Sequence, residues 1–195
     1  MFILIFSSMA AYGVQRMKWK LSGSVMMFFL MGMMVPIHAT LIPLYINFSR
    51  AGLLDNYISL ILPYVTFALP STILILSGFF STIPREMEEA AVIDGSSILR
   101  AFVQIILPIS QPALITVMIF NFIGTWNELL VAVIFISNAD RYTLPVGLKN
   151  FVGLYSTNYA PMLAATSLAV LPTIIIYSIF NTQIVAGITA GAIKG

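Results

Sequence analysis

The stretch PREMEEAAVIDGSSILRAFVQIILP, residues Pro84 to Pro108, holds four of the seven acidic residues of the chain and lies between uncharged hydrophobic runs. A charged segment between two apolar ones must reach water, because lipid solvates neither ionised side chains nor unpaired backbone groups. We therefore expect a loop over residues 81–108 that lies outside the bilayer and joins two membrane segments.

Within this loop, the sequence predicts two short helices joined by a turn. Ser81-Thr82 are N-cap residue types, Pro84 suits a first helical turn, and the glutamates that follow favour the positive end of the helix dipole. Asp94-Gly95 predicts the turn, because glycine readily adopts positive φ. The second helix, Ser97 to Leu107, is expected to run back to the membrane and to end at Pro108, which cannot donate a helical hydrogen bond.

The spacing of residues in the loop is also informative. Glu89-Ala90-Ala91 is followed after three residues by Gly95, and after nine more by Ile105-Ile106-Leu107-Pro108. This pattern resembles the EAA loop of ATP-binding-cassette (ABC) importer permeases. The resemblance implies that the loop docks as a cytoplasmic coupling helix on an ATP-binding subunit. The coupling residues would be Glu89, Ala90, Ala91, Asp94, Gly95, Ile105, Leu107 and Pro108. The competing interpretation is an ordinary hydrophilic loop, which the complete spacing disfavours.

Composition independently predicts an integral membrane protein. Hydrophobic residues make up 59% of the chain and charged residues 8%, whereas soluble domains carry about 25% charged residues. Nine basic against seven acidic residues give too small an excess for nucleic-acid binding. The absence of cysteine and the single histidine leave no thiolate or histidine metal cluster, so we expect no metal site and no bound cofactor. No nucleophile with a base, acidic pair or phosphate-binding loop indicates an enzyme.

We predict an all-α, polytopic membrane protein with one transmembrane domain over residues 1–195 and about five membrane segments. The first, Phe2 to Val14, spans only about 20 Å as a helix, against about 30 Å of hydrocarbon. The other four are Ser22 to Leu44, Tyr57 to Phe80, Ala113 to Ile136 and Met162 to Val185. Outer loops are expected at Asn47 to Asn56 and at Ser137 to Pro161. Pro63 and Pro70 are expected to kink the segment Tyr57 to Phe80, and Pro172 the last segment.

The basic residues fix the expected orientation. Six of the nine, including Arg16, Arg85 and Arg100, fall inside if the amino terminus is outside and the carboxyl terminus is cytoplasmic. This agrees with the positive-inside rule and places loop 81–108 in the cytoplasm. We expect the protein in a prokaryotic cytoplasmic membrane.

A carboxylate inside an apolar run, Glu128 of Trp126-Asn127-Glu128, is the main candidate for a polar path. Intramembrane carboxylates are costly and mark either a pathway or a buried partner. Trp126, Asn127 and Glu128 could line a sugar path, since amides and carboxylates bond hydroxyl groups and an indole ring stacks on a sugar. The alternative, which the sequence favours, is that Glu128 pairs with a polar group on a neighbouring helix or subunit.

Several further stretches are similar to the maltose-type carbohydrate branch of the ABC permeases. They are the Ala10-Ala11-Tyr12-Gly13 start, residues 36–56, Trp126-Asn127-Glu128, and the ending Gly187 to Gly195. The resemblance implies a sugar or oligosaccharide importer. Its partners would be a second permease subunit, two ATP-binding subunits that hold ATP and magnesium, an extracytoplasmic solute-binding protein, and membrane lipid.

Three alternatives stay open at this point: a permease for a solute other than a sugar, a structural membrane subunit without transport, and a secondary transporter, which a lone Glu128 supports little. Members of the carbohydrate branch have about six spans. Because the first is missing here and the second is short, the chain is expected to be truncated at its amino terminus.

Overall fold

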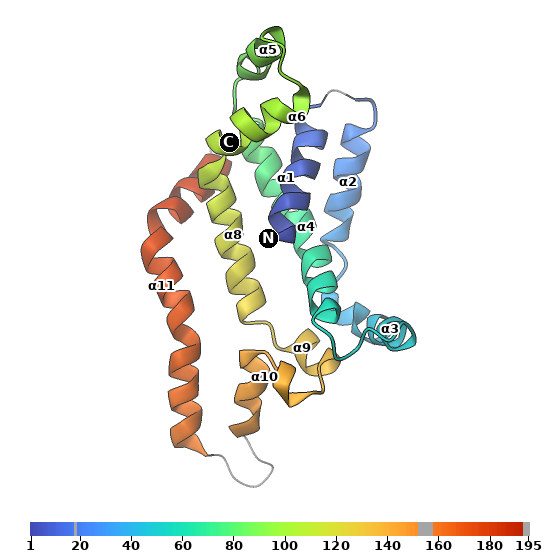
Figure 1. The fold of residues 1–195 in the computed structure, drawn as a ribbon, viewed down its shortest axis with the longest axis vertical. Helices are drawn as coiled ribbons and strands as arrows, with labels where there is room; N and C mark the ends of the chain where they lie inside the picture. Colours follow the sequence, from blue (N-terminus) through green and yellow to red (C-terminus); the bar gives the residue numbers. More distant parts are fainter. Residues whose placement is uncertain (18, 152–157, 193–195) are drawn as a thin grey trace. The chain divides into compact units, whose positions relative to one another are not determined.

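The structure, a computed structural model, describes residues 1–17, 19–151 and 158–192, with side chains as far as Asn181. Throughout these residues the regular elements are helical (Figure 1). In chain order they are α1 (Phe2–Gln15), α2 (Ser22–Gly32), α3 (Ile37–Arg50), α4 (Ile58–Phe80), α5 (Glu86–Ile93), α6 (Ile98–Ala101), the π-helix η1 (Phe102–Ile106), α7 (Leu107–Ile109), α8 (Gln111–Trp126), α9 (Leu130–Phe135), the 3₁₀ turn η2 (Ala139–Arg141), α10 (Leu144–Leu148), the 3₁₀ turn η3 (Lys149–Phe151) and α11 (Tyr159–Ala192).

The helices include segments able to cross a membrane. Among the described residues, α4 and the Tyr159–Asn181 part of α11 are long and apolar enough by themselves. Two broken pairs, α2 with α3 and Ile98–Ile109 with α8, would raise the number to four if each pair forms one span. α1 is a shorter apolar helix of 14 residues. The prediction of an all-α, polytopic membrane protein is thus confirmed.

The chain forms two compact units, and α4 and α8 each contribute residues to both. Unit 1 comprises residues 1–34, 67–120 and 181–195. Its core is a cluster in which Ile73, Leu76 and Phe80 of α4 pack with Tyr12 of α1 and with apolar residues of η1 and α8. The loop between α4 and α8 belongs entirely to this unit.

Unit 2 comprises residues 35–66 and 121–180. Its core gathers around Phe135 of α9, whose ring lies 5.4 Å from that of Phe48 on α3. The segment after α3 is fixed to the segment after α9 by Asp55, which has a φ of 58°. The Asp55 carboxylate accepts hydrogen bonds from the backbone N–H groups of Asn138 at 2.9 Å and Ser137 at 3.0 Å.

The predicted span from Ser22 to Leu44 is wrong as a continuous helix, because the structure breaks it between α2 and α3. Pro36 has extended backbone angles and is the N-cap of α3. Proline lacks the N–H that would continue the helix and disfavours helical geometry in the residue before it. Near the break, a Cβ on Gly32 would lie 3.3 Å from the Pro70 ring, so glycine permits a close approach of α2 to α4.

The predicted span from Ala113 to Ile136 is also interrupted. α8 ends at Trp126 and α9 begins at Leu130, which leaves Asn127 and Glu128 in the break. The Glu128 carboxylate accepts hydrogen bonds from the backbone N–H of Val131 at 2.8 Å and of Ala132 at 3.2 Å. The side chain thus satisfies the free N–H groups at the start of a new helix, as a capping residue does.

The prolines in the two long helices do not break them. α4 runs unbroken from Ile58 to Phe80 through Pro63 and Pro70, and α11 runs through Pro172. Non-helical backbone angles within α11 occur at Phe180, and the kink at Pro172 stays a prediction. One proline removes one hydrogen bond, which a helix held by its remaining bonds tolerates.

The predicted outer loops have more structure than expected. α3 continues to Arg50, inside the first predicted loop. The second, Ser137 to Pro161, contains η2, α10 and η3, and its last residues begin α11. Residues 152–157 of this loop lie outside the described residues.

Asp55 gives a pH-dependent prediction. The hydrogen bonds from the backbone of Asn138 and Ser137, together with the nearby Arg141 guanidinium, hold the pKa of Asp55 below its usual value of 3.8. Its contribution to stability is therefore complete above that value and is lost as the pH falls through the lower, folded pKa. We expect Asp55→Ala to lower the melting temperature in detergent at pH 7 and to speed amide exchange at Ser137 and Asn138.

The difference between Asp55→Ala and the wild type should shrink as the pH is lowered below 3.8. Asp140→Ala, which changes an exposed aspartate of the same unit, is the control. An unchanged exchange rate at both amides would contradict the role given to Asp55.

Candidate functional site

The loop begins where α4 ends, and the hydroxyl groups of its first polar residues bond to carbonyls of α4. The Ser81 hydroxyl donates to the Gly78 carbonyl at 2.7 Å, and the Thr82 hydroxyl donates to the Phe79 carbonyl at 2.8 Å. The prediction that they cap the next helix is wrong, because the N-cap residue of α5 is Arg85. α5 starts at Glu86 behind Arg85, which makes no side-chain cap bond. Three glutamates fill its first turn, where the helix dipole favours negative charge.

The turn predicted at Gly95 is confirmed. Gly95 has a φ of +83°, its N–H donates to the Val92 carbonyl at 3.0 Å, and the Ser96 N–H donates to the Ala91 carbonyl at 2.8 Å. This pair of bonds is the Schellman motif, which closes the carboxyl end of a helix around a left-handed residue. Asp94 is the last residue before the turn and is exposed.

The second arm of the loop is a helix of mixed type. It starts at Ser97, whose hydroxyl accepts a bond from the Arg100 N–H at 3.3 Å. The prediction that it ends at Pro108 is wrong, because helical geometry continues to Ile109 and the chain bends by 76° at Ser110. The π-helix η1 precedes the proline, with the Leu107 N–H bonded to the Phe102 carbonyl. This wider turn lets Pro108 occupy the first turn of α7, where no N–H is needed.

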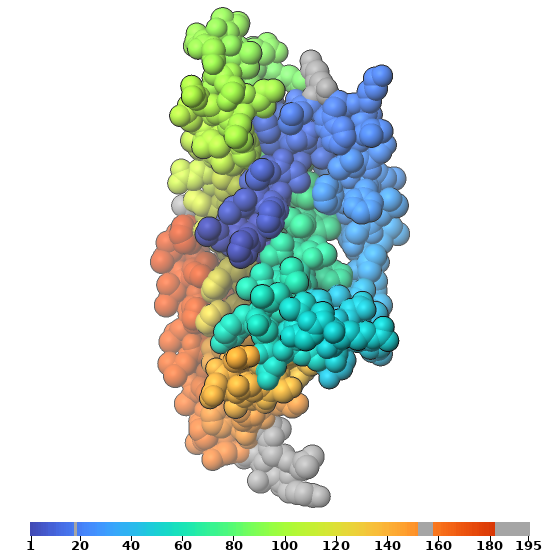
Figure 2. Space-filling model, turned by 45° about the vertical axis from the view of Figure 1, so that its right-hand side comes forward, coloured from blue at the N-terminus to red at the C-terminus, as the bar shows by residue number. Residues whose placement is uncertain are grey.

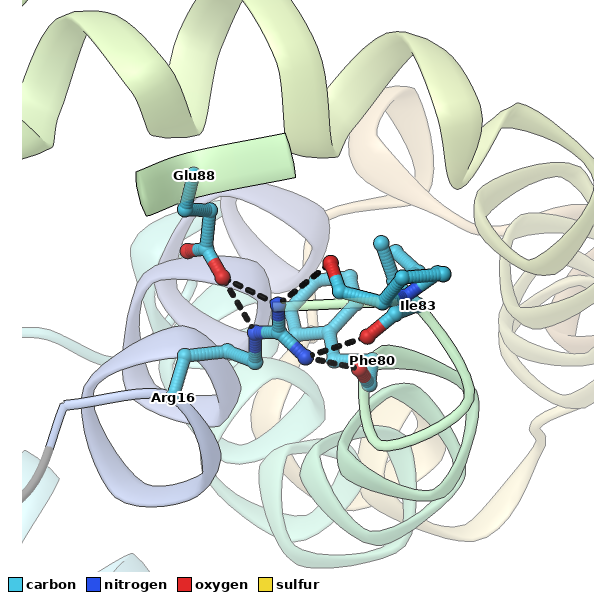
Figure 3. Close-up of polar contacts among 5 residues, drawn as sticks. Arg16, Phe80, Ile83 and Glu88 are labelled. Atoms are coloured by element: carbon cyan, nitrogen blue, oxygen red, sulfur yellow. Dashed lines mark hydrogen bonds and ion pairs between the residues drawn. The ribbon is translucent and has the colours of Figure 1, made fainter. Parts of the chain in front are cut away.

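Arg16, at the carboxyl end of α1, reaches into the junction of α4 and α5 (Figure 3). Its Nη1 donates to the carbonyls of Phe80 at 3.1 Å and Ile83 at 2.6 Å, and its Nη2 donates to that of Pro84 at 3.3 Å. Nε donates to the Glu88 carboxylate at 2.6 Å, and Nη2 forms the ion pair with the same oxygen. A guanidinium has five N–H donors, and here all five have acceptors although Arg16 is 92% buried.

A hollow of about 810 Å³ lies between the end of α1 and the loop. Its wall on the α1 side includes Tyr12, Arg16 and Trp19, and α5 and α6 supply the other wall. Val92, Ile93 and Ile98 line it although they remain exposed, Ile93 by 85%. Figure 2 shows this loop, in green, projecting past the ends of α1 and α2, in blue. Apolar side chains in a water-exposed loop are typical of a surface that binds a protein.

The structure separates the predicted coupling residues into two groups. Glu89, Ala90, Asp94 and Gly95 are exposed, and with the half-buried Ala91 they form the tip of the loop. Three others lie in the second arm: Ile105 and Leu107 are half-buried, and Pro108 is exposed. Leu107 packs on the core of unit 1.

Sequence reasoning did not identify the Arg16–Glu88 pair or the exposed apolar residues of the hollow. From the sequence, Arg16 is informative only as a positive charge that indicates the orientation of the chain in the membrane. The two residues are 72 positions apart, and no local pattern connects them. For Ile93 and Ile98 the sequence does contain a signal, since these two apolar residues flank a turn that is expected to lie in water.

The second candidate, Trp126-Asn127-Glu128, lies in unit 2 with its polar groups occupied. The Trp126 indole N–H donates to the Ala169 carbonyl at 3.0 Å, and its ring stacks on Phe122 with centroids 5.5 Å apart. The Asn127 amide is exposed and donates to the Ile123 carbonyl at 2.8 Å. Glu128 accepts a bond from the Tyr64 hydroxyl of α4 at 2.6 Å, so it has the partner on a neighbouring helix that the sequence favoured.

Comparison with known proteins gives consistent matches. Residues 3–189 match the family described as binding-protein-dependent transport system inner membrane component. The chain is 38% identical to the trehalose transport system permease of Mycobacterium tuberculosis, over 98% of this chain and 71% of that protein. It is 34% identical to a diacetylchitobiose uptake system permease of Streptomyces coelicolor, over 100% and 70%, and 35% identical to the trehalose/maltose transport system permease of Thermococcus litoralis, over 97% and 68%.

The fold has a counterpart among solved structures. A chain in the crystal structure of a bacterial ABC transporter involved in the import of the acidic polysaccharide alginate superposes with a TM-score of 0.77 at 22% identity. The match covers 93% of this chain and 68% of that one. The chain described here thus spans roughly two thirds of the length of the proteins that it resembles.

The Schellman turn predicts the effect of adding one methyl group. Gly95→Ala should destabilise the protein by about 1–2 kcal/mol, the cost of a left-handed backbone for a residue with a Cβ. Thermal unfolding in detergent measures the change. Gly78→Ala in α4 is the matched control, since its added Cβ would meet no atom within 4 Å and its φ is not positive; an equal loss in both variants would contradict the prediction.

Proposed function

Because the chain belongs to the family of binding-protein-dependent transport system inner membrane components, we propose that it is the permease subunit of an ATP-driven importer for a sugar or oligosaccharide. The sugar assignment is supported by relatives whose names specify trehalose, maltose or diacetylchitobiose, at 34–38% identity. A solute other than a sugar is the second candidate. A structural subunit without transport receives no support from any particular contact.

The observation that carries the proposal is the exposed apolar surface of the loop. Ile93, the last residue of α5, is 85% exposed, and Leu99 of α6 is 65% exposed. Apolar side chains on a segment that must lie in water favour a protein partner at that place. We infer that this partner is an ATP-binding subunit and that α5 with the Gly95 turn enters a cleft on it. Glu89, Ala90, Ala91, Asp94 and Gly95 would form the contact, and Ile105, Leu107 and Pro108 would connect it to α8.

The complete importer would contain this chain, a second permease subunit, two ATP-binding subunits and an extracytoplasmic solute-binding protein. As a member of a membrane permease family, the chain acts in a cytoplasmic membrane and is not itself the ATPase. ATP and magnesium would bind to the partner subunits. The proposed orientation has the loop and the carboxyl terminus in the cytoplasm and the amino terminus of this chain outside, following the basic residues.

A sugar path through Trp126, Asn127 and Glu128 stays a prediction. Asn127 offers an exposed amide, whereas Trp126 and Glu128 are engaged with Phe122, Ala169 and Tyr64. These contacts support a role for Glu128 in joining α9 to α4 over direct contact with the sugar.

The proposed binding of the loop to an ATP-binding subunit predicts the effect of two substitutions in the loop. Gly95→Pro cannot keep a φ of +83°, since proline fixes φ near −65°, and Glu89→Lys reverses an exposed charge in the first turn of α5. Each should reduce the ATP-binding subunits that co-purify with the permease by about tenfold or more, which corresponds to about 1.4 kcal/mol of binding free energy. The amount of permease in the membrane should not change.

Asp140→Lys provides the charge-reversal control, because Asp140 is exposed and belongs to unit 2. It should leave co-purification at the wild-type value. ATP-binding subunits recovered at wild-type yield with both loop variants would overturn the docking proposal.

Glu128 is tested by two variants with different consequences. Glu128→Gln replaces the carboxylate with an amide that has one acceptor oxygen, and Tyr64→Phe removes only the hydroxyl that bonds it. If Glu128 joins α9 to α4, both variants should reduce the yield of assembled complex. If it contacts the solute, Glu128→Gln alone should reduce uptake of the sugar that the wild-type complex transports from a labelled panel. Unchanged uptake and unchanged yield in both variants would exclude either role.

A further inference from the structure

The carboxyl end of α1 contacts both arms of the loop from one face. Arg16 bonds Glu88 of α5, and the Tyr12 ring lies 4.7 Å from that of Phe102 in η1. Positions 12 and 16 are four apart, which places them on the same side of a helix. Tyr12 and Phe102 are both buried, 8% and 5% exposed. A single helical turn therefore holds the loop at two points.

We propose that Arg16 is the positioning residue that fixes α5 to the ends of α1 and α4, so that a displacement of α5 is transmitted to these two helices. This inference rests on the proposed function, because it assumes that an ATP-binding subunit moves α5. It adds to that function the route by which the movement reaches the membrane helices.

The linker between α4 and α5 explains why such a residue is needed. Only residues 81–85 separate Phe80 from Glu86, and the last carbonyls of a helix have no partner within it. Arg16 supplies N–H donors to the carbonyls of Phe80, Ile83 and Pro84. Without these bonds, the linker would be held by its own turn and by the buried side chain of Ile83, and α5 would pivot more freely relative to α4.

The chemistry of the contact requires arginine. The positive charge lies at the carboxyl end of α4 and faces a carboxylate in the first turn of α5, so both helix dipoles favour it. The planar fork bonds the carbonyls and the carboxylate at the same time. A lysine has three donors on one nitrogen and cannot reproduce five bonds directed at α4, the linker and α5.

The test compares three variants of the complete importer in proteoliposomes that contain the binding protein. Arg16→Gln removes the contact with both helices. Glu88→Ala removes the contact of Arg16 with α5 and leaves the bonds from Arg16 to the Phe80 carbonyl of α4 and to the linker carbonyls of Ile83 and Pro84. Arg50→Gln, an exposed arginine at the end of α3 in unit 2, is the control for the loss of a positive charge. The measurements are the recovery of ATP-binding subunits, the rate of ATP hydrolysis and the sugar transported per ATP.

We expect Arg16→Gln and Glu88→Ala to retain the ATP-binding subunits and to hydrolyse ATP. Sugar transported per ATP should fall by at least about fivefold, the lower end of typical coupling between two sites. A residue with a merely structural role would lower the recovery of complex and leave this ratio unchanged. Wild-type sugar per ATP in Glu88→Ala would overturn the proposal, even if Arg16→Gln does not fold. If instead the wild-type complex transports no sugar, the proposed function is contradicted, and with it the inference that rests on that function.

A second measurement examines the contact without transport. The chain has no cysteine, so spin labels can be attached at Glu86→Cys in the first turn of α5 and at Leu21→Cys, whose native side chains are both exposed. Electron–electron double resonance on the assembled complex should give a broader distance distribution in Glu88→Ala than in the doubly labelled parent. An unchanged distribution would contradict the fixing of α5 by Arg16.

Discussion

A guanidinium group removed from water must find acceptors for five N–H groups, and this requirement organises the end of unit 1 around Arg16. Desolvating an ion pair is unfavourable by several kcal/mol, and only a complete set of partners offsets it. Arg16 obtains that set from three carbonyls and one carboxylate. The ends of α1, α4 and α5 are thus held at one point, because moving any one of them would leave a buried charge without a partner.

Unit 2 uses carboxylates for a related purpose. Asp55 bonds the backbone N–H groups that follow α9, and Glu128 bonds those in its first turn. In an apolar environment a helix can be interrupted only where something satisfies the freed backbone groups. Asp55 and Glu128 are therefore found where helices stop or start. This also explains why Glu128 is tolerated in a hydrophobic run, since its two oxygens accept bonds from Tyr64, Val131 and Ala132.

Those interruptions mark the limit of what the sequence could predict. Hydropathy identified the apolar stretches, and the Gly95 turn followed from a single residue type. Hydropathy reports which solvent a segment meets, however, and not whether its backbone is continuous. The stretches Ser22 to Leu44 and Ala113 to Ile136 were therefore each assigned one helix where the structure has two. Ser81 and Thr82 were misassigned for a similar reason, because N-cap residue types also bond the carbonyls of a preceding helix. The Arg16–Glu88 contact depends on tertiary packing alone.

α5 could not be an independent helix. It has eight residues, none of which is buried among those described, and isolated helices shorter than about 12–15 residues are marginal in water. Its order must come from its two ends, where the Arg16–Glu88 pair holds the first turn and the Schellman bonds around Gly95 close the last. A helix stabilised only at its ends leaves the side chains between them free to meet another protein. The loop is thus exposed enough to bind a partner and is still tied at its first turn to α1 and to the end of α4, which is the arrangement that the proposed transmission of movement through Arg16 requires.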